Sequence, residues 1–475
     1  MAQLVSTEQW QKTLTDMIAQ EAELSEIIKA IHNSGGYAFL VGGAVRDLLL
    51  GKETKDLDIE VHGLTLEQLA QVLEQFGYVN YVGKAYGVLR LEKLDIDWSI
   101  PRKDRSGRKP EVEIDPDMPL EQAFKRRDLT INAMGIDLHT LKLVDPFNGT
   151  KDLEHRIFRP TDQAFFIEDP LRLFRVMQFV SRFDGTPTLE LDQICKEMDL
   201  SDVSRERIEQ EFFKMLLRSK RPSLGIRWLA DIGRLKDVLP ELYQTIGILQ
   251  NPDWHPEGDV FEHTMQALDQ AALLDYDSEE ERIAIMFAAL CHDLGKSTTT
   301  KYVDGKWRSI GHAAAGVSLT TSLLKRIIGK KELIKTIGKL VKYHMEPYIF
   351  IAGGAGPGAY KRLASKLAPQ TNIAQLVKVN TADKRGRQGA KKEDLAKSFL
   401  EDSEFAMIAK RYGVYYNPET PVLRGEDIKD LVEPGPKMGW LLERVYQWQI
   451  ENSVTDRERL RRYVQMMCKE KNKKI

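Results

Sequence analysis

One stretch of the chain, FLVGGAVRDLLLGKETKDLDIEV (residues 39–61), restricts the possible folds more than any other. Its first residues form an apolar run that suits a strand, and Gly42–Gly43 interrupts this run before the helical spacing of AVRDLLLG. The segment KDLDIEV then alternates acidic and apolar residues, which is typical of a half-buried strand. This order of strand, glycine turn, helix and strand predicts a mixed α/β domain.

A second segment, LDIDWSI (residues 94–100), repeats the acidic alternation. If both segments form neighbouring strands, their period of two places Asp56, Asp58 and Asp97 on one face of a sheet. Carboxylates brought together in this way repel one another unless a cation lies between them, and Mg²⁺ suits such oxygen-rich sites. Two such ions can support phosphoryl or nucleotidyl transfer. We therefore predict that these carboxylates hold Mg²⁺ at a site of phosphoryl or nucleotidyl transfer.

The glycine turn adds a phosphate-binding element. Glycines between a strand and a helix allow backbone N–H groups to approach phosphate oxygens at the N-terminus of the helix. Arg46, one turn into the predicted helix, adds a fixed positive charge and a fork of donors. Gly43 and Arg46 are therefore candidate ligands of a phosphate group.

Length and composition predict a multidomain protein of the cytoplasm. A chain of 475 residues exceeds what one hydrophobic core supports, and 42% apolar and 29% charged residues are ordinary for a globular protein. The first residues lack the pattern of a secretory signal, and the longest apolar run is too short to span a bilayer, so we expect no membrane partner. Three scattered cysteines give neither a disulfide framework nor a zinc site.

The predicted fold class is α+β multidomain, with a mixed α/β head built on a small sheet and helical regions after it. Residues 6–33 have the apolar spacing of a single helix, with a capping box at Ser6 and Gln9, and Gly35–Gly36 would end it. The predicted segments are an N-terminal helix (1–36), the head (37–160), a helical neck and body (161–250), a metal-dependent domain (251–392) and a helical tail (393–475).

Five of the nine histidines fall within residues 251–392, and one of them is followed directly by an aspartate. Histidine nitrogens and carboxylate oxygens together make a mixed site that borderline divalent metals accept. The candidate ligands of a first metal are His263, His292, Asp293 and Asp383; the further candidates are His312 and His344, for a second metal or a phosphate, and Lys296, for a substrate phosphate.

Basic residues are clustered along the chain, although its net charge is only −2. Clusters of this kind beside candidate sites favour a polyanionic partner. They occur at residues 101–109, 125–127, 384–392, 457–463 and 469–474.

Taken in order, the motifs resemble those of the class II tRNA nucleotidyltransferase and poly(A) polymerase family. The pattern LVGGAVRDLLLG…KDLDIEV is similar to the signature of its head domain, and RRDLTINAMGID (126–137) to its second motif. EDPLRLFRVMQF (168–179) resembles its base-reading helix, SRERIEQE (204–211) the element after it, and LRGEDIKDLVEPGPKMG (423–439) a C-terminal element. The resemblance covers nearly the whole chain.

This resemblance implies roles for the head residues. Gly43 and Arg46 would hold the triphosphate of the incoming nucleotide, and Asp56 and Asp58 would bind Mg²⁺. Asp97 would be the third carboxylate, which helps to deprotonate the RNA 3′-hydroxyl.

The resemblance also implies how the nucleotide is chosen. Arg127, with Asp128 beside it, would contact the sugar–phosphate part, and Asp169 and Arg172 would read the Watson–Crick edge of CTP or ATP, with Arg175 at the nucleotide. The spacing i, i+3 and i+6 lets Asp169, Arg172 and Arg175 share one face of a helix, where a carboxylate accepts and a guanidinium donates.

One position departs from the family pattern. Where many members have a further arginine one turn on, this chain has Gln178, which can donate and accept hydrogen bonds but carries no charge. The departure leaves open whether the chain adds CCA, only CC or only A.

The order H…HD…D in residues 251–392 resembles the HD phosphohydrolase superfamily. Fused behind a nucleotidyltransferase head, such a domain is similar to that of the multifunctional bacterial CCA enzymes. The resemblance implies a divalent transition metal and phosphatase and 2′,3′-cyclic phosphodiesterase activities.

The favoured function is template-independent addition of CCA to tRNA 3′ ends from CTP and ATP, together with HD phosphohydrolysis. The helical body and an RNA-binding tail would hold the tRNA acceptor end. Poly(A) polymerase is an alternative, which VGKAYGVLRL (82–91) mildly disfavours because it lacks paired basic residues. Addition of CC or A alone would depend on a loop within residues 101–116.

An alternative of another class is an HD phosphohydrolase whose head has become a non-catalytic RNA-binding module. Loss of catalysis usually removes the metal-binding carboxylates and the nucleotide-binding arginines first. Asp56, Asp58, Arg127 and Arg172 are all present, which argues against this alternative.

Overall fold

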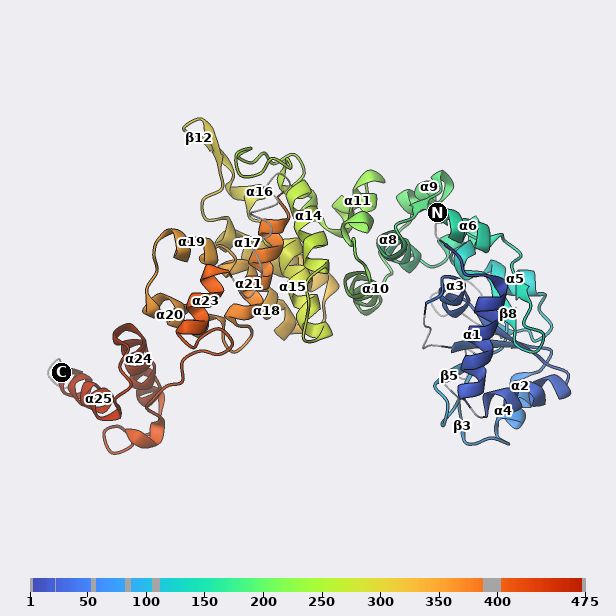
Figure 1. Ribbon diagram of the computed structural model, residues 1–475, viewed down its shortest axis with the longest axis horizontal. Coiled ribbons are helices and arrows are strands. Elements are labelled where there is room, and N and C mark those ends of the chain that lie inside the picture. The colour runs from blue at the N-terminus through green and yellow to red at the C-terminus, as the bar shows by residue number, and fades with distance from the viewer. Residues whose placement is uncertain are drawn as a thin grey trace. The chain divides into compact units, whose positions relative to one another are not determined.

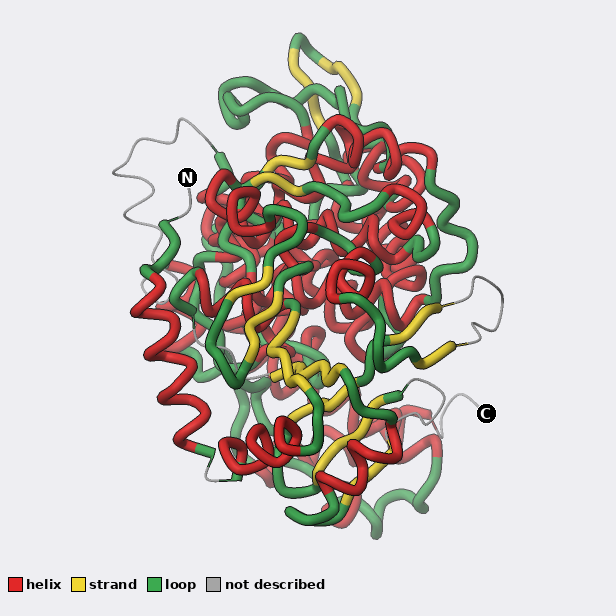
Figure 2. Tube along the Cα trace, turned by 90° about the vertical axis from the view of Figure 1, so that its right-hand side faces the viewer, coloured by secondary structure: helices red, strands yellow, loops and turns green. Residues whose placement is uncertain are grey.

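The computed structural model describes residues 3–21, 23–52, 57–81, 87–104, 112–387 and 403–471. Its internal contacts divide the chain into two compact units, Met1–Ser204 and Arg205–Ile475 (Figure 1). Helix predominates over strand along the trace (Figure 2). Asp56 lies outside the described residues, as do parts of the segments 82–91, 101–116 and 384–392 that entered the sequence analysis.

A seven-stranded mixed sheet forms the centre of the first unit. Its strand order is β3-β4-β5-β2-β1-β8-β9, and within it β2 and β5 are parallel while the other neighbours are antiparallel. The strands are β1 (Tyr37–Val41), β2 (Leu57–His62), β3 (Val79–Tyr81), β4 (Val88–Leu91), β5 (Ile96–Ser99), β8 (Gly135–Asp137) and β9 (Leu143–Val144). The sheet confirms the mixed α/β head.

The N-terminal stretch that the sequence predicts as one helix forms two, α1 (Thr7–Gln20) and α2 (Leu24–Asn33). The predicted capping box is present, because the Ser6 and Gln9 side chains each accept from the other's backbone N–H. The first helix ends because Glu21 adopts an extended conformation (φ −94°, ψ 91°). Gly35, with φ of +86°, follows the second helix as predicted.

Short helices accompany the sheet, and the apolar side chains between them form the core of the unit. Val45, Leu69 and Trp98 are fully buried there. These helices are α3 (Gly43–Leu49), α4 (Leu66–Leu73), α5 (Leu120–Lys125), α6 (Gly149–His155), α7 (Gln163–Ile167), α8 (Leu171–Phe183) and α9 (Leu189–Glu197). Two-residue strands β10 (Ile157–Phe158) and β11 (Thr186–Pro187) pair in parallel, and β6 (Arg102–Asp104) pairs with β7 (Val112–Ile114).

The second unit is helical in its described part, apart from the hairpin of β12 (Lys301–Val303) and β13 (Lys306–Arg308). Its centre is α15 (Glu279–Cys291), whose residues from Ile283 onwards are all buried and which contacts α14 (Val260–Ala272), α18 (Lys331–Tyr343) and α21 (Ile373–Arg385). The remaining longer helices are α10 (Arg205–Arg218), α11 (Ser223–Asp231), α17 (His312–Ile327), α20 (Pro357–Leu367), α23 (Glu404–Arg411), α24 (Pro436–Asn452) and α25 (Arg457–Lys471). The shorter ones are α12 (Leu235–Val238), α13 (Pro240–Tyr243), α16 (Lys296–Thr299) and α19 (Glu346–Ala352).

The division between the units falls inside the segment 161–250 that the sequence analysis treats as one neck and body. Helix α8 belongs to the first unit and α10 to the second. Near the end of the chain, α24 and α25 enclose an apolar cluster that includes Leu441, Val445 and Leu460. The five domain boundaries given above stay predictions.

Candidate nucleotide and metal sites

The parallel pairing of β2 and β5 brings two of the predicted carboxylates together. Asp58 is the register partner of Asp97, so both side chains lie on the same face of the sheet. Asp58 is exposed, whereas Asp97 is partly exposed and accepts from Arg90 Nε at 2.8 Å and Nη2 at 2.6 Å. The structure therefore places Asp58 and Asp97 side by side, with one of them held by an arginine.

Glu60 follows Asp58 on the same face of β2 but is fully buried. Its carboxylate lies 3.3 Å from His62 Nε2 and 3.0 Å from Arg126 Nη2, with Arg127 Nη2 at 3.6 Å. Burial alone would raise the pKa of Glu60, but the His62 hydrogen bond and the charges of the two arginines lower it to about 2. Glu60 thus joins the RRD motif to β2, a role that its place in the alternation did not reveal.

The glycine turn is tightly enclosed. Gly42 has φ of +72°, and a Cβ there would lie 2.8 Å from Arg127 Nη1, so no larger residue fits without displacement. Gly43 is the first residue of α3. Arg46 is buried, where its Nη1 donates to Asn132 Oδ1 at 2.5 Å and its guanidinium lies 4.8 Å from the Phe183 ring centroid. In this geometry Arg46 joins α3 to the second motif and to α8.

Asp128 connects the second motif to the predicted base-reading helix. Its Oδ2 accepts from Arg175 Nε at 2.7 Å, and its Oδ1 accepts from Asn132 Nδ2 at 2.9 Å. Burial would raise the pKa of Asp128, but the Arg175 charge and the hydrogen bond from Asn132 lower it to about 2. Arg172 donates to the backbone carbonyls of Phe165 and Arg126. Arg172 and Arg175 are therefore held in fixed orientations.

One residue of the predicted base-reading helix lies differently from expectation. Asp169 precedes α8, which begins at Leu171 after Pro170, and its Oδ1 accepts from the Leu171 N–H at 3.2 Å. The physical reason is that proline lacks an N–H and suits the start of a helix, so the carboxylate before it acts on the free N–H groups there. Gln178 is buried, and its Oε1 accepts from Arg182 Nη1 at 3.2 Å.

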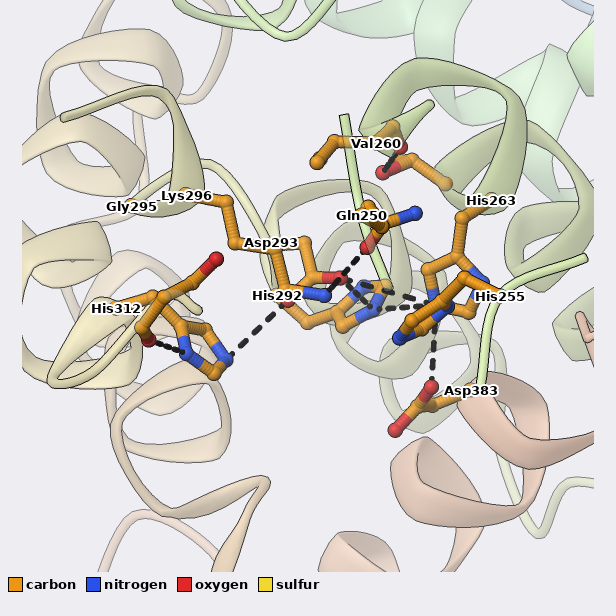
Figure 3. Close-up of polar contacts among 12 residues, drawn as sticks. Gln250, His255, Val260, His263, His292, Asp293, Gly295, Lys296, His312 and Asp383 are labelled. Atoms are coloured by element: carbon orange, nitrogen blue, oxygen red, sulfur yellow. Dashed lines mark hydrogen bonds and ion pairs between the residues drawn. The ribbon is translucent and has the colours of Figure 1, made fainter. Parts of the chain in front are cut away.

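In the second unit, helix ends bring the predicted histidines and aspartates together (Figure 3). All of these side chains are buried. His263 lies on α14, His292 and Asp293 directly follow α15, His312 begins α17, His344 directly follows α18, and Asp383 lies on α21.

A first group surrounds His263. Its Nε2 lies 3.2 Å from His292 Nε2 and 3.1 Å from Asp383 Oδ1. Asp293 Oδ2 completes the group, at 3.2 Å from His292 Nε2 and 3.7 Å from His263 Nε2. His263, His292 and Asp293 thus form a compact group, and Asp383 joins it through His263.

A second group shares Asp293 with the first. The other oxygen of this carboxylate, Oδ1, lies 3.3 Å from His312 Nε2 and 3.9 Å from His344 Nε2. The two Nε2 atoms lie 3.2 Å apart. Asp293 therefore stands between two sets of ligands, which supports the interpretation of His312 and His344 as a second set.

The orientation of each imidazole is set by its other nitrogen. The Nδ1 atoms of His292, His312 and His344 lie 2.7–2.8 Å from the backbone carbonyl three residues earlier, and His263 Nδ1 lies 2.7 Å from Glu257 Oε1. A carbonyl accepts only from N–H, so Nδ1 carries the proton in these three residues and the lone pair of Nε2 faces the cluster. Burial also lowers the pKa of His344 to about 3, which keeps it neutral.

Two cations balance the carboxylates. Lys296 Nζ lies 2.7 Å from Asp293 Oδ2 and donates to Gln250 Oε1 at 2.7 Å, and Arg387 Nη2 lies 3.1 Å from Asp383 Oδ1. Burial would raise the pKa of Asp293, but His292 and Lys296 hold it well below its usual range. Glu257, Gln250 and Arg387 were not predicted. Glu257 lies within the segment HPEGD (255–259) and Gln250 shortly before it, and the sequence of this stretch alone indicates no ligand contact.

The donor set fits a divalent metal. Imidazole nitrogens and carboxylate oxygens lie within 4.8 Å of one another in the group His263–His292–Asp293 and in the group Asp293–His312–His344. This N/O chemistry suits borderline divalent ions. A cavity of about 330 Å³ opens onto the cluster.

Comparison with known proteins agrees with this geometry in both units. Residues 38–159 match the poly A polymerase head domain, and residues 260–384 match the HD domain. The fold resembles that of the Bacillus stearothermophilus CCA-adding enzyme in complex with CTP, with a TM-score of 0.64 at 20% identity, covering 96% of this chain and 99% of that one. The fold also resembles that of the Thermotoga maritima CCA-adding enzyme complexed with tRNA. The TM-score is 0.54 at 20% identity, and the match covers 92% of this chain and 93% of that one.

Closer relatives identify the family. The multifunctional CCA protein of Mannheimia succiniciproducens is 36% identical over 366 residues, which cover 74% of this chain and 84% of that protein. The multifunctional CCA protein of Hahella chejuensis is 40% identical over 319 residues, which cover 64% of this chain and 72% of that protein. The chain belongs to the multifunctional CCA protein family. Among the described residues, no helix is both long and apolar enough to cross a membrane.

Proposed function

We propose that this protein adds C, C and A to the 3′ ends of tRNA, using CTP and ATP. The observation that carries the proposal is the pairing of Asp58 with Asp97 on the face of the sheet that Glu60 ties to the RRD motif. Carboxylates on adjacent strands beside a set of oriented arginines are what nucleotidyl transfer to an RNA hydroxyl requires. The family to which the chain belongs is named for CCA.

The head residues have the following proposed roles. Asp56 and Asp58 hold Mg²⁺, and when bound these ions would neutralise the triphosphate and favour attack by the RNA 3′-hydroxyl. Asp97, oriented by Arg90, accepts the proton of that hydroxyl. Gly43, Arg46 and Arg127 are assigned to the phosphates and sugar of the nucleotide.

Nucleotide choice is assigned to the region around α8. Arg172 and Asp169 would read the base edge, and the carbonyls that fix Arg172 restrict its guanidinium to one orientation. Arg175, held by Asp128, would contact the nucleotide. Gln178 is assigned the orientation of Arg182 and no part in the choice of nucleotide, in place of the direct contact that the family pattern implies.

The second unit is proposed to be a phosphohydrolase that acts on RNA 3′ ends bearing a phosphate or a 2′,3′-cyclic phosphate. A divalent transition metal would be held by His263, His292, Asp293 and Asp383, and a second by Asp293, His312 and His344. Such metals supply an electrophile for phosphate oxygens and lower the pKa of water. Lys296 holds the Asp293 carboxylate in place and offers a positive charge at the floor of the cavity.

The proposed RNA partner fits a basic groove of about 780 Å³ between α17 and α18. Its cationic side chains would meet RNA phosphates in a salt-dependent way. The groove is lined by Arg205, Lys325, Lys331, Lys335, Lys339 and Lys342. We assign the protein to the cytoplasm, where the three free cysteines remain reduced.

The decisive test is a gel assay on tRNA that lacks its 3′ CCA, with Mg²⁺ and labelled CTP alone, ATP alone, and then both. We expect three added residues and then a stop. A long A tail would instead indicate poly(A) polymerase, and addition of CC or A alone would indicate a divided pathway. Absence of any addition, with phosphohydrolysis retained, would favour a non-catalytic RNA-binding head.

A further inference from the structure

The cavity over the His/Asp cluster has aromatic side chains on its walls. Trp254, Trp307 and Tyr348 all line it. Trp254 is 58% exposed and Tyr348 is 52% exposed, although large aromatic side chains are usually buried. Aromatic side chains that line one cavity together offer apolar surface on which a ligand can pack.

Short connections position the two tryptophans relative to the metal ligands. Trp254 lies between Gln250, which accepts from Lys296, and Glu257, which orients His263. Trp254 is also held in a turn, because its N–H donates to the Asn251 carbonyl at 3.1 Å. The turn therefore holds the Trp254 backbone between two residues that contact the cluster, and its side chain lines the same cavity.

Trp307 lies on the β12–β13 hairpin, which projects from the helices of its unit (Figure 1). The Tyr302 ring packs against it at a centroid distance of 5.0 Å. The hairpin is closed by the hydrogen bond between Thr300 Oγ1 and Ser309 Oγ at 2.8 Å, and the Ser309 carbonyl accepts from His312 Nδ1. The second tryptophan is thus connected to the second set of ligands.

The other lining residues include charged and amide side chains of the kind that a nucleotide contacts. Lys384 and Arg387 supply positive charge, and Asn251 and Asn380 supply neutral donors and acceptors. The volume of about 330 Å³ lies within the range of small-molecule sites. A phosphate ligand without a base would use the cluster and the cations but would leave the aromatic walls uncovered.

We propose that Trp254 and Trp307 stack the nucleobase of the nucleotide whose phosphate lies at the His/Asp cluster, and that Tyr348 completes this base subsite. The cavity is then specific for nucleotide phosphates over phosphate esters that lack a base. The inference rests on the proposed phosphohydrolase function of the second unit and names the part of the substrate that this cavity recognises. Stacking of one base on an aromatic side chain contributes roughly 1–3 kcal/mol.

The test compares two phosphomonoesters of secondary hydroxyls, adenosine 2′-phosphate and glycerol 2-phosphate, with Mn²⁺, Co²⁺ and Ni²⁺ supplied in turn. Trp254→Ala and Trp307→Ala should each raise KM for adenosine 2′-phosphate roughly 10- to 100-fold and leave kcat and the hydrolysis of glycerol 2-phosphate unchanged. Trp254→Phe should restore most of the loss. Trp440→Ala, which removes an exposed tryptophan of α24, is the matched control.

Binding without turnover supplies a second measurement. Adenosine 2′-phosphate should quench tryptophan fluorescence of the full chain in EDTA, and the quench should shrink in Trp254→Ala and Trp307→Ala but not in Trp440→Ala. An equal loss of activity on both esters, or an unchanged KM for the nucleotide, would overturn the base subsite. If the unmodified chain hydrolysed neither ester, the phosphohydrolase proposal would fail, while the quench would still decide whether a base binds.

Discussion

The two candidate sites differ in the groups that surround their buried carboxylates. In the head, buried acids are matched by cations of the protein: Asp128 with Arg175, and Glu60 with Arg126. In the second unit, Lys296 is paired with Asp293, but the imidazole nitrogens of four histidines also surround this carboxylate. Neutral nitrogens that face one another gain little from each other and are the groups that a divalent ion binds.

This difference teaches how each site depends on its surroundings. The head arginines are oriented by side chains and by backbone carbonyls. A substitution of one of these side chains therefore changes both the orientation of the arginine and the stability of the head. The histidines are oriented mainly by backbone carbonyls at helix ends, which no side-chain substitution removes. The second site therefore depends most on its one shared carboxylate.

The largest expected effect is that of Asp293→Ala, which removes both oxygens between the two sets of histidines. Metal ions supply several kcal/mol of transition-state stabilisation, so phosphohydrolysis should fall on the order of a thousandfold. CCA addition should be unchanged, and bound metal measured by mass spectrometry should fall. Asp58→Ala is the reverse control, with addition lost and hydrolysis kept. Substantial hydrolysis by Asp293→Ala would contradict the assigned cluster.

Glu60→Gln should reveal the charge pairing of the head as acid-dependent stability. The pKa of Glu60 falls from 4.5 in the unfolded chain to about 2 in the folded protein. This difference corresponds to ~3 kcal/mol of stability. Because the folded pKa is depressed, that stability is present above pH 4.5 and is lost as the pH falls toward 2.

The measurement is urea unfolding of both proteins, followed with a probe in the first unit. At pH 7 the variant should be less stable by ~3 kcal/mol, and the gap should narrow by more than half at pH 3. If the difference in unfolding free energy stayed constant with pH, the lower stability of the variant would come from altered packing and not from the lost charge.

Glu257→Gln should weaken metal binding without abolishing it. Glu257 is the only side chain among the Nδ1 partners of the histidines described above, and loss of such a partner typically costs about 10- to 100-fold in metal affinity. Competition with a chelator of known affinity would measure it. Glu262→Gln, one residue before His263 but paired with Arg227, should leave metal affinity unchanged. An equal loss in both variants would point to a general disturbance of α14.

The smallest effect is expected for Gln178→Met, which keeps the side-chain length and removes the acceptor for Arg182. A single buried hydrogen bond contributes about 1 kcal/mol, so thermal stability should fall slightly. The ratio of kcat/KM for CTP and ATP should stay unchanged. A change in that ratio would instead support direct contact of Gln178 with the nucleotide.

Much of the head could be predicted because alternation fixes which side chains share a face. The strands around Asp58 and Asp97 follow from a period of two, and their adjacency follows once they pair. The burial of Arg46 could not be predicted, because its partners Asn132 and Phe183 come from distant elements. The break between α1 and α2 also went unseen, since the apolar spacing of two successive helices resembles that of one.

In the second unit, residue type alone indicated the ligands, since clustered histidines and aspartates have few other uses. Their grouping around Asp293 could not be predicted, because it depends on which ends of α15, α17 and α18 meet. The contribution of Glu257 was equally hidden: an acid in a turn-rich segment is ordinary until the fold places it beside His263.

The register of β2 on β5 has a consequence for how the chain tolerates change. Asp58 lies opposite Asp97, and Ile59, one residue on, is buried opposite Trp98. An insertion or deletion that shifts this pairing by one residue would separate the carboxylates and also turn apolar side chains toward water. A variant whose carboxylates are misaligned is therefore also poorly folded. Selection against unfolded protein removes such a variant whatever its activity would be.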